Sequence, residues 1–283
     1  MVTTINGVPY GSIDYINGVT GSNAVIYMGS VIGIDADAKT FFTATGITNA
    51  TQKDALNNLV IGLKSNNLWS KMQCIYPFLG GTATTHKFNL KNPVDSNAAF
   101  RLVFSGGWTH SSTGAQPNGT NGYANSFFAP STNQSVNNNG LGMYITQRTV
   151  SQSDPVQMGS FTQVNQASLI LVTATSMNAR LNGGNSATTI GGGSGSFDAH
   201  RTSATVTKQY KNGTSIKNYN SGGTLTANTI YLGTLNVAAA PYASGYINSE
   251  FRFAYMSEGL TDTEVSNLRT LVQTYQTALG RNL

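Results

Sequence analysis

Short apolar runs separated by turn-forming residues are the feature that most constrains how this chain folds. Glycine, asparagine, threonine and serine recur between the runs along most of the sequence, and 31 of the 283 residues are glycine. Apolar runs of about four to eight residues bounded in this way are typical of β-strands joined by tight turns. The pattern therefore predicts a mostly β protein.

The body of the chain, residues 74–283, carries the clearest strand signals. Residues 168–175 form a largely apolar run, which indicates a strand buried on both faces. Asn212-Gly213 separates two strand-like segments, and this dipeptide is a strong signal for the turn of a β-hairpin. Residues 250–256 predict another strand.

Residues 35–73 form the first region with helical spacing. Thr51 and Asp54 have the spacing of a capping box, with Asp in place of the usual Glu. The apolar residues that follow fall on one helical face: Leu56, Leu59, Val60 and Leu63. We interpret this segment as a helical linker that leads into the β-rich body.

Residues 261–279 give the clearest prediction of a single element. Thr261 and Glu264 form a capping box, an apolar stripe follows at helical spacing, and Gly280 stands where a left-handed C-terminal cap belongs. We expect this closing helix to pack against the outside of the body.

Residues 1–34 contain a short repeat. Each copy includes Asn-Gly, whose residues tolerate the positive φ of a tight turn, so the repeat predicts short strands joined by turns. The repeated residues are Ile5, Asn6, Gly7 and Val8, and then Ile16, Asn17, Gly18 and Val19. A strip this small does not fold alone. It either pads its own domain or adds strands to a partner, and we interpret it as an N-terminal docking arm.

Charged residues make up only 10% of the chain, and the net charge is +5. An ordinary globular protein has about 25% charged residues. One basic group is close together in sequence: Arg201, Lys208, Lys211 and Lys217. We interpret it as one solvated hairpin, because nucleic-acid binding needs a denser patch. No segment is long and apolar enough to span a bilayer, so we expect neither nucleic acid nor a membrane as a partner.

The carboxylates do not form the pattern of a glycoside hydrolase. Such an enzyme needs two carboxylates on the same side, and residues two apart on a strand point the same way. Of the three glutamates, Glu264 is explained by helix capping, and Glu250 is followed at that spacing by Arg252. We therefore expect no glycosidase activity.

The histidines do not predict a nucleophilic or zinc site. Asp198 and His200 have the spacing to share a strand face, but the glycine-rich residues 191–195 beside them suggest an exposed turn. No Gly-x-Ser-x-Gly elbow in a strand-to-helix setting accompanies them. His86 and His110 are too scattered in sequence for a zinc site. We expect the chain not to be an enzyme.

Four aromatic residues are candidates for binding glycans, because they stand in polar, glycine-rich surroundings and aromatic rings offer apolar faces to sugars. They are Trp108, Tyr123, Tyr242 and Tyr246. The alternative is that each ring fills a gap in the core or packs against a neighbouring subunit.

Five segments in a fixed order resemble the concanavalin A-like, laminin-G-like domains of bacteriophage structural proteins. They are residues 68–78, 88–93, 210–213, 259–264 and 276–281. The repeated Ile-Asn-Gly-Val arm is similar to the start of phage head and tail appendage proteins. The resemblance covers residues 41–283 as a pattern and rests on the order of the segments. It implies a two-sheet antiparallel jelly-roll sandwich and a place in the virion, as a fibre, spike or decoration protein.

A virion protein is made in the host cytoplasm and released by lysis. This route fits a chain of extracellular composition whose first residues lack the basic end and apolar core of a signal peptide. The expected partners are other virion proteins, bound through the arm, and further copies of the chain, with a trimer as the arrangement common in such appendages.

We expect no cofactor, although laminin-G-like modules, which the chain resembles, often hold a structural calcium ion, for which Asp154 and Asp198 would be the candidate ligands. Two alternative functions stay open. One is a receptor-binding module that grips a host-surface polysaccharide, and the other is a depolymerase that trims it.

Overall fold

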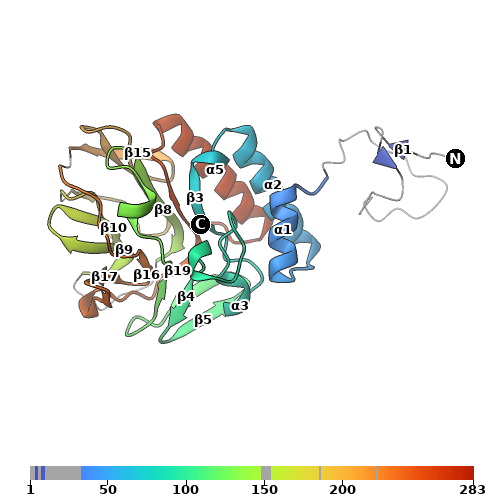
Figure 1. Cartoon of the computed structure of the whole chain (residues 1–283), viewed down its shortest axis with the longest axis horizontal. Helices are drawn as coiled ribbons and strands as arrows, with labels where there is room; N and C mark the ends of the chain where they lie inside the picture. The colour runs from blue at the N-terminus through green and yellow to red at the C-terminus, as the bar shows by residue number, and fades with distance from the viewer. Residues whose placement is uncertain (1–3, 6–7, 10–32, 148–153, 185, 221) are drawn as a thin grey trace.

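The computed structural model describes residues 4–5, 8–9, 33–147, 154–184, 186–220 and 222–283. The body consists of two β-sheets stacked face to face, with helices packed on the outer side of one sheet (Figure 1). One sheet is the middle layer, with the helices on one side of it and the second sheet on the other. We call this middle layer the central sheet and the second sheet the outer sheet. The mostly β class, the two-sheet antiparallel sandwich and the C-terminal helix are as the sequence predicts.

The central sheet has eight strands in the order β15-β14-β13-β8-β19-β6-β5, and β3 also pairs with β19. All of its pairs are antiparallel. The strands are β3 (Met72–Tyr76), β5 (Trp108–Ser111), β6 (Gly114–Pro117), β8 (Asn139–Thr146), β13 (Gly195–Arg201), β14 (Thr207–Lys211), β15 (Thr214–Tyr219) and β19 (Glu250–Ser257).

The outer sheet has nine strands in the order β12-β11-β10-β9-β16-β7-β4, with β17 paired to β9 and β18 paired to β17. Its pairs are antiparallel except for β17 with β9. The strands are β4 (Val103–Ser105), β7 (Tyr123–Asn125), β9 (Val156–Gln163), β10 (Gln166–Val172), β11 (Ser176–Leu181), β12 (Ala187–Thr189), β16 (Tyr231–Leu232), β17 (Leu235–Val237) and β18 (Ala240–Pro241).

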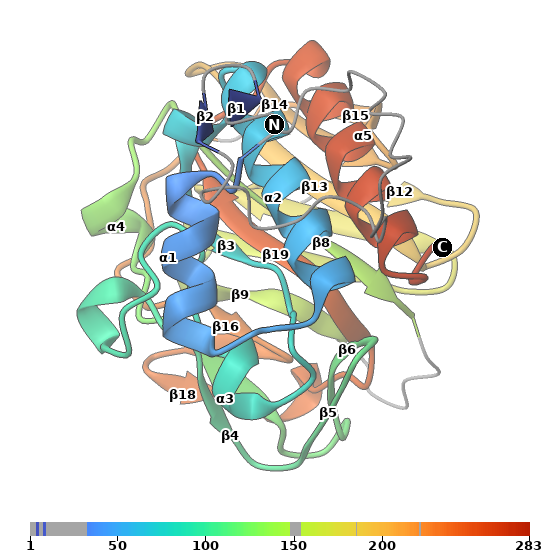
Figure 2. The same cartoon turned by 90° about the vertical axis from the view of Figure 1, so that its right-hand side faces the viewer.

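Three long helices cover the central sheet, and short helical turns lie in the connections (Figure 2). The α-helices are α1 (Ala36–Thr45), α2 (Ala50–Ser65), α3 (Ala83–His86), α4 (Pro130–Asn133) and α5 (Asp262–Ala278). The 3-10 turns are η2 (Trp69–Lys71), η3 (Asn97–Ala99) and η4 (Ala243–Gly245).

The main apolar core lies between the two sheets. Met143, Phe197 and Phe251 project from the central sheet into this space. Met158 and Ile170 meet them from the outer sheet, and all five side chains are buried. Alternate residues of each strand therefore face this shared interior, as expected for stacked sheets.

A second core lies between the central sheet and the helices. Phe253 and Tyr255 project from β19 to this side, and Leu63 and Val272 meet them from α2 and α5. The middle strands of the central sheet are thus covered on both faces. This explains why their residues are nearly all buried instead of alternating between core and solvent.

The region 35–73 contains α1, α2 and η2, and its last two residues begin β3; the two long helices pack as a layer of the body. α1 and α2 lie beside α5 over the central sheet (Figure 2). Gly62 permits the close approach of α2 to α5, because a Cβ there would lie 2.4 Å from Leu271 Cδ2. The predicted apolar stripe is buried in this layer: Leu56, Leu59, Val60 and Leu63.

The start of α2 differs from the prediction. The N-cap is Asn49, whose side-chain oxygen accepts a hydrogen bond from Gln52 N at 3.0 Å. Asparagine is among the strongest N-cap residues, so the helix begins at Ala50 and Thr51 lies inside the first turn. The predicted Thr51–Asp54 capping box was wrong.

The closing helix and the hairpin agree with the prediction. In α5 the Thr261 side chain accepts from Glu264 N while the Glu264 side chain accepts from Thr261 N, and Gly280 follows with a φ of 67°. Asn212 and Gly213 join β14 to β15 with φ angles of 50° and 79°, the positive values that a type I′ turn requires.

Arg201 does not lie on a solvated hairpin. It ends β13, is only 2% exposed, and donates hydrogen bonds to the Thr207 hydroxyl and the Ala204 carbonyl. The basic group is therefore divided, because Arg201 belongs to a buried strand and the three lysines to the hairpin that follows.

The described part of the N-terminal arm is a short hairpin. β1 (Thr4–Ile5) pairs antiparallel with β2 (Val8–Pro9) on either side of the first Asn-Gly in the sequence. The remaining predicted docking residues lie outside the described residues: Asn6, Gly7, Ile16, Asn17, Gly18 and Val19. Within the described part of the chain, no helix is long and apolar enough to cross a bilayer.

Candidate functional site

The structure brings two of the predicted aromatic residues directly together. Trp108 on β5 donates a hydrogen bond from Nε1 to the Tyr123 carbonyl on β7 at 3.1 Å. The Trp108 ring is half-buried and packs on Phe104 and Phe251. The Tyr123 ring stacks on Tyr231 of β16 with 4.9 Å between ring centres.

Tyr246 joins this group, whereas Tyr242 lies apart. Burial and the neighbouring Tyr123 raise the pKa of both Tyr231 and Tyr246. Tyr246 is only 9% exposed, so its ring face is covered. Tyr242 packs on the apolar cluster at the outer sheet, and its hydroxyl lies 3.5 Å from the Asp154 carboxylate. Of the four predicted residues, Trp108, Tyr123 and Tyr242 are half-buried and keep part of the exposure that stacking on a sugar needs.

A surface groove of about 290 Å³ lies elsewhere, between the β13–β14 region and the N-terminal end of α5. Its size is close to the lower limit for small-molecule sites, which begin at roughly 300 Å³. Buried residues form the floor: His200, Tyr210 and Leu260. Polar residues form the rim: Thr202, Lys208, Thr261, Asp262 and Thr263.

An ion pair crosses the rim of the groove. Lys208 Nζ lies 2.9 Å and 2.7 Å from the two carboxylate oxygens of Asp262, and the Tyr210 hydroxyl donates to the same carboxylate at 2.7 Å. These hydrogen bonds, first from Lys208 and then from Tyr210, lower the pKa of Asp262. The carboxylate therefore stays ionised at neutral pH, and the Lys208–Asp262 pair adds no net charge to the groove.

The rim also offers free hydroxyl groups. Thr202 and Thr263 are exposed, and within the described residues their hydroxyls make no hydrogen bond. Thr261 is committed to capping α5 through Glu264. Two hydroxyls, a carboxylate and an ammonium group thus surround a floor that consists of ring and aliphatic side chains.

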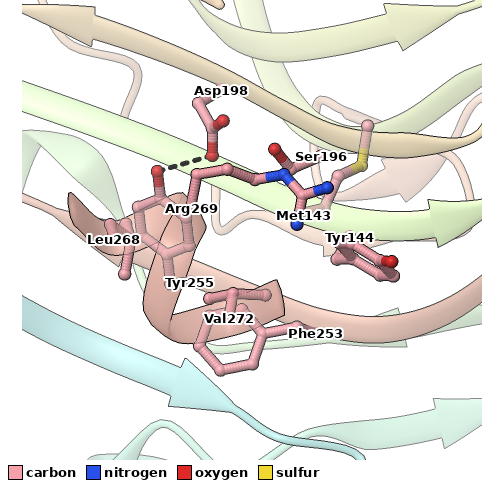
Figure 3. Close-up of a pocket in the computed structure, with 9 residues that line it drawn as sticks. All are labelled: Met143, Tyr144, Ser196, Asp198, Phe253, Tyr255, Leu268, Arg269 and Val272. Carbon is pink, nitrogen blue, oxygen red and sulfur yellow. Dashed lines mark hydrogen bonds between the residues drawn. The ribbon is translucent and has the colours of Figure 1, made fainter. Parts of the chain in front are cut away.

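The floor is fixed by a chain of hydrogen bonds that runs into the protein. His200 Nδ1 accepts from Leu260 N at 3.3 Å, so the ring proton of a neutral His200 lies on Nε2, 3.0 Å from the Tyr255 hydroxyl. Tyr255 in turn donates to Asp198 at 2.7 Å (Figure 3). Asp198 and His200 do share a strand face, as predicted, but β13 is buried and the predicted exposed turn was wrong.

Burial dominates the titration of this chain. It lowers the pKa of His200 to about 3 and raises that of Asp198 to about 7, although Tyr255 opposes the shift at Asp198. Both ring nitrogens of His200 are already engaged, and the neutral imidazole is favoured. His200 is therefore placed to hold the floor of the groove, and it has no nitrogen left to act as a base toward a ligand.

The groove has the features of a binding site more than those of a hydrolytic site. Of the described residues that line it, only Asp262 carries a carboxylate. The other candidate, Glu250, is 3% exposed and pairs with Arg252 at 3.5 Å in β19. Among the described residues, no cluster of three or more potential metal ligands is present. Asp154 contacts Tyr242, whereas Asp198 contacts Tyr255, so the two calcium candidates have different surroundings.

Sequence reasoning missed the groove because its walls are far apart in the chain. Lys208 and Asp262 are separated by 54 positions, and neither lies in a local motif for ligand binding. Lys208 was visible only as part of a basic group, and Thr261 only as a helix cap. The strand pattern around Lys208 and the helix start at Asp262 could have placed each residue near the end of an element. Nothing in the sequence near either residue indicates that these two ends meet.

No protein-family model matches the sequence, and no curated protein matches it. Among solved structures, botulinum neurotoxin type C, whose cell entry is dependent upon interaction with two ganglioside molecules, matches 74% of this chain and 53% of its own, at 13% identity with a TM-score of 0.51. The binding domain of botulinum neurotoxin DC, in complex with rat synaptotagmin II, matches 72% and 52%, at 12% identity with a TM-score of 0.50.

Domain 4 of a GH43 extracellular arabinanase from Geobacillus stearothermophilus, in complex with arabinotriose, matches 70% of this chain and 98% of its own, at 14% identity with a TM-score of 0.46. The match spans about half the length of each neurotoxin chain. At such low identities the likeness to the neurotoxin structures shows the fold alone, namely a β-sandwich.

Proposed function

We propose that this protein is a non-enzymatic carbohydrate-binding module whose ligand lies in the groove between β14 and α5. The observation that carries the proposal is the groove itself, in which the Lys208–Asp262 pair and two exposed threonines stand over a fixed, mostly buried floor. Small-molecule sites combine such a floor with a small number of oriented polar groups.

The chemistry of the rim suits a polyhydroxylated ligand of low charge. The Asp262 carboxylate accepts from hydroxyl groups, the Lys208 ammonium donates to hydroxyl or ring oxygens, and the threonine hydroxyls do both. Hydrogen bonds to such charged groups contribute about 1.5–3 kcal/mol each. Because the ion pair is internally neutral, a neutral sugar meets no uncompensated charge in this groove.

The fold supports the same proposal more loosely. Botulinum neurotoxin type C, which shares this fold, depends for cell entry on interaction with two ganglioside molecules. Gangliosides carry sugars. A shared fold does not transfer a function, so the groove of this chain is the stronger support. The aromatic group around Tyr123, with Tyr242 apart from it, supplies the other rings at which a sugar would be expected, as the sequence predicts.

Binding of the full chain to an array of bacterial polysaccharides and oligosaccharides tests the proposal. We expect binding to a restricted set of glycans, without release of reducing ends. Lys208→Met is expected to weaken binding about tenfold or more, because losing one charge-assisted hydrogen bond removes at least about 1.4 kcal/mol. Lys217→Met is the matched control, since Lys217 is an exposed lysine on the adjacent strand β15, outside the groove.

The possible results separate the rival interpretations. No glycan bound at all would contradict the proposal. Binding that is lost in Tyr123→Ala and unchanged in Lys208→Met would place the ligand at the aromatic group. If the parent chain releases reducing ends from a glycan and the Glu250→Gln variant does not, the protein is a depolymerase. This result would contradict the expectation that the chain is not an enzyme.

We further propose that the module is displayed on a phage particle and held there by residues 1–34. The support is the pairing of β1 with β2, in which Ile5 and Val8 of the first Ile-Asn-Gly-Val unit lie opposite each other. Deleting residues 1–34 is expected to abolish incorporation into particles and to leave glycan binding by the body intact. Incorporation of the truncated chain at the normal level would contradict the docking role. Sedimentation of the full chain tests the expected homo-oligomer.

A further inference from the structure

A small cavity lies beneath α5, between the helix and the central sheet. Its volume is about 10 Å³, which is close to the space that one water molecule requires. Ser196 and Asp198 of β13 line one side, and Arg269 of α5 lines the other (Figure 3). Tyr144 and Tyr255 contribute ring surfaces to the remaining wall.

The polar groups around this cavity have unused hydrogen-bonding capacity. Ser196 Oγ and Arg269 Nη1 are buried and have no hydrogen-bond partner in the described part of the protein. Asp198 receives one hydrogen bond at Oδ1, from Tyr255, and none is formed at Oδ2 within the described residues. The Ser196 hydroxyl interacts with the Asp198 carboxyl closely enough to lower its pKa, but the two groups do not form a hydrogen bond of normal geometry.

A dry cavity here would be costly. Each buried polar group without a partner costs about 1–3 kcal/mol, and more when the group is charged. Arg269 contacts the Tyr144 ring, with 5.3 Å between the guanidinium carbon and the ring centre, but such a contact leaves the Nη1 donors unsatisfied. Internal waters typically make about three hydrogen bonds to groups of this kind, and the cavity offers three.

A monatomic ion fits less well than water. A cation would lie against the Arg269 guanidinium, and an anion would lie against the Asp198 carboxyl. Water accepts from the guanidinium and donates to the serine or carboxyl oxygen at the same time. We therefore infer that one ordered water molecule occupies this cavity and links Arg269 of α5 to Ser196 and Asp198 of β13.

This water would extend the hydrogen-bond chain of the groove floor. The chain would run from Leu260 through His200, Tyr255 and Asp198 to the water, and from there to Arg269 on the helix. α5 would then be bound to the central sheet by a polar link as well as by its apolar stripe. The inference does not depend on what the groove binds.

A crystal structure of the full chain, at a resolution where ordered waters are visible, tests the inference directly. We expect a single peak within hydrogen-bonding distance of Ser196 Oγ, Arg269 Nη1 and the Asp198 carboxyl. An empty cavity, or a guanidinium bonded directly to Asp198, would overturn the inference. A crystal soaked in bromide would overturn it too if an anomalous peak appeared in the cavity, because the occupant would then be an anion.

Thermal unfolding of two matched variants gives an independent test. Ser196→Ala removes one partner of the water, so we expect the Tm to fall by about 2–4 °C. Ser168→Ala removes another buried serine hydroxyl without a partner, but one that does not line this cavity, so the Tm should stay unchanged or rise. If the two variants behave alike, the link through the water is wrong.

Discussion

Replacing Asp198 with asparagine is expected to make folding stability less dependent on pH. Asp198 is fully enclosed between the central sheet and α5, and burial raises its pKa from 3.8 to about 7. A shift of one pKa unit corresponds to about 1.4 kcal/mol. Ionising this carboxyl in the folded protein therefore costs up to about 4 kcal/mol relative to the unfolded chain. An asparagine at this position would keep an oxygen that accepts from Tyr255 and would never ionise.

The sign follows from the direction of the shift. Because the pKa is raised in the folded state, the contribution of Asp198 to stability is fully present below about pH 4 and is lost as the pH rises through about 7. Asp198→Asn should therefore differ little from the parent at about pH 4. It should become more stable than the parent by as much as about 4 kcal/mol above pH 7.

Urea unfolding of both proteins across this pH range measures the effect. The informative quantity is the difference between their free energies of unfolding at each pH. Shifts at groups outside this hydrogen-bond chain, such as the lowered pKa of His86, then cancel. A difference that stays constant from acid to neutral pH would show that Asp198 is not buried in the way described, and would refute this reasoning.

Three further predictions concern stability, each measured by chemical unfolding. Gly142→Ala should cost about 1–3 kcal/mol, because its Cβ would lie 2.2 Å from Asp198 Oδ1; a neutral result would contradict the packing of β8 on β13. Arg281→Met should cost about 3 kcal/mol or more, since this buried guanidinium donates to several backbone carbonyls; a loss below about 1 kcal/mol would mean that water replaces them. Asn212→Val should cost about 1–2 kcal/mol at its positive φ, whereas Thr214→Val, on the exposed strand beside it, should be tolerated.

Local signals made part of the fold predictable from the sequence. The Asn212-Gly213 turn, the Thr261–Glu264 cap and the Gly280 C-cap each depend on a few neighbouring residues, and all three are present. The Thr51–Asp54 box failed because Asn49, a stronger cap nearby, was available.

Features that depend on contacts between distant strands were harder to predict from the sequence. Asp198 and His200 were predicted in an exposed turn because of the glycines before them. The burial of β13 results from pairing with β8 and β14 and from cover by α5, none of which is visible at the residues themselves. The groove could not be predicted from the sequence for the same reason, since its rim forms only when α5 packs beside β14.

Locating the bound sugar tests the central claim most directly. Amide chemical shifts of the full chain can be followed while the tightest-binding glycan from the array is added. We expect the largest changes at Thr202, Lys208, Asp262 and Thr263, with few changes at the outer sheet. Changes concentrated at Tyr123 and Tyr242, or spread over surfaces that do not include the groove, would contradict the claim that the groove between β14 and α5 binds carbohydrate.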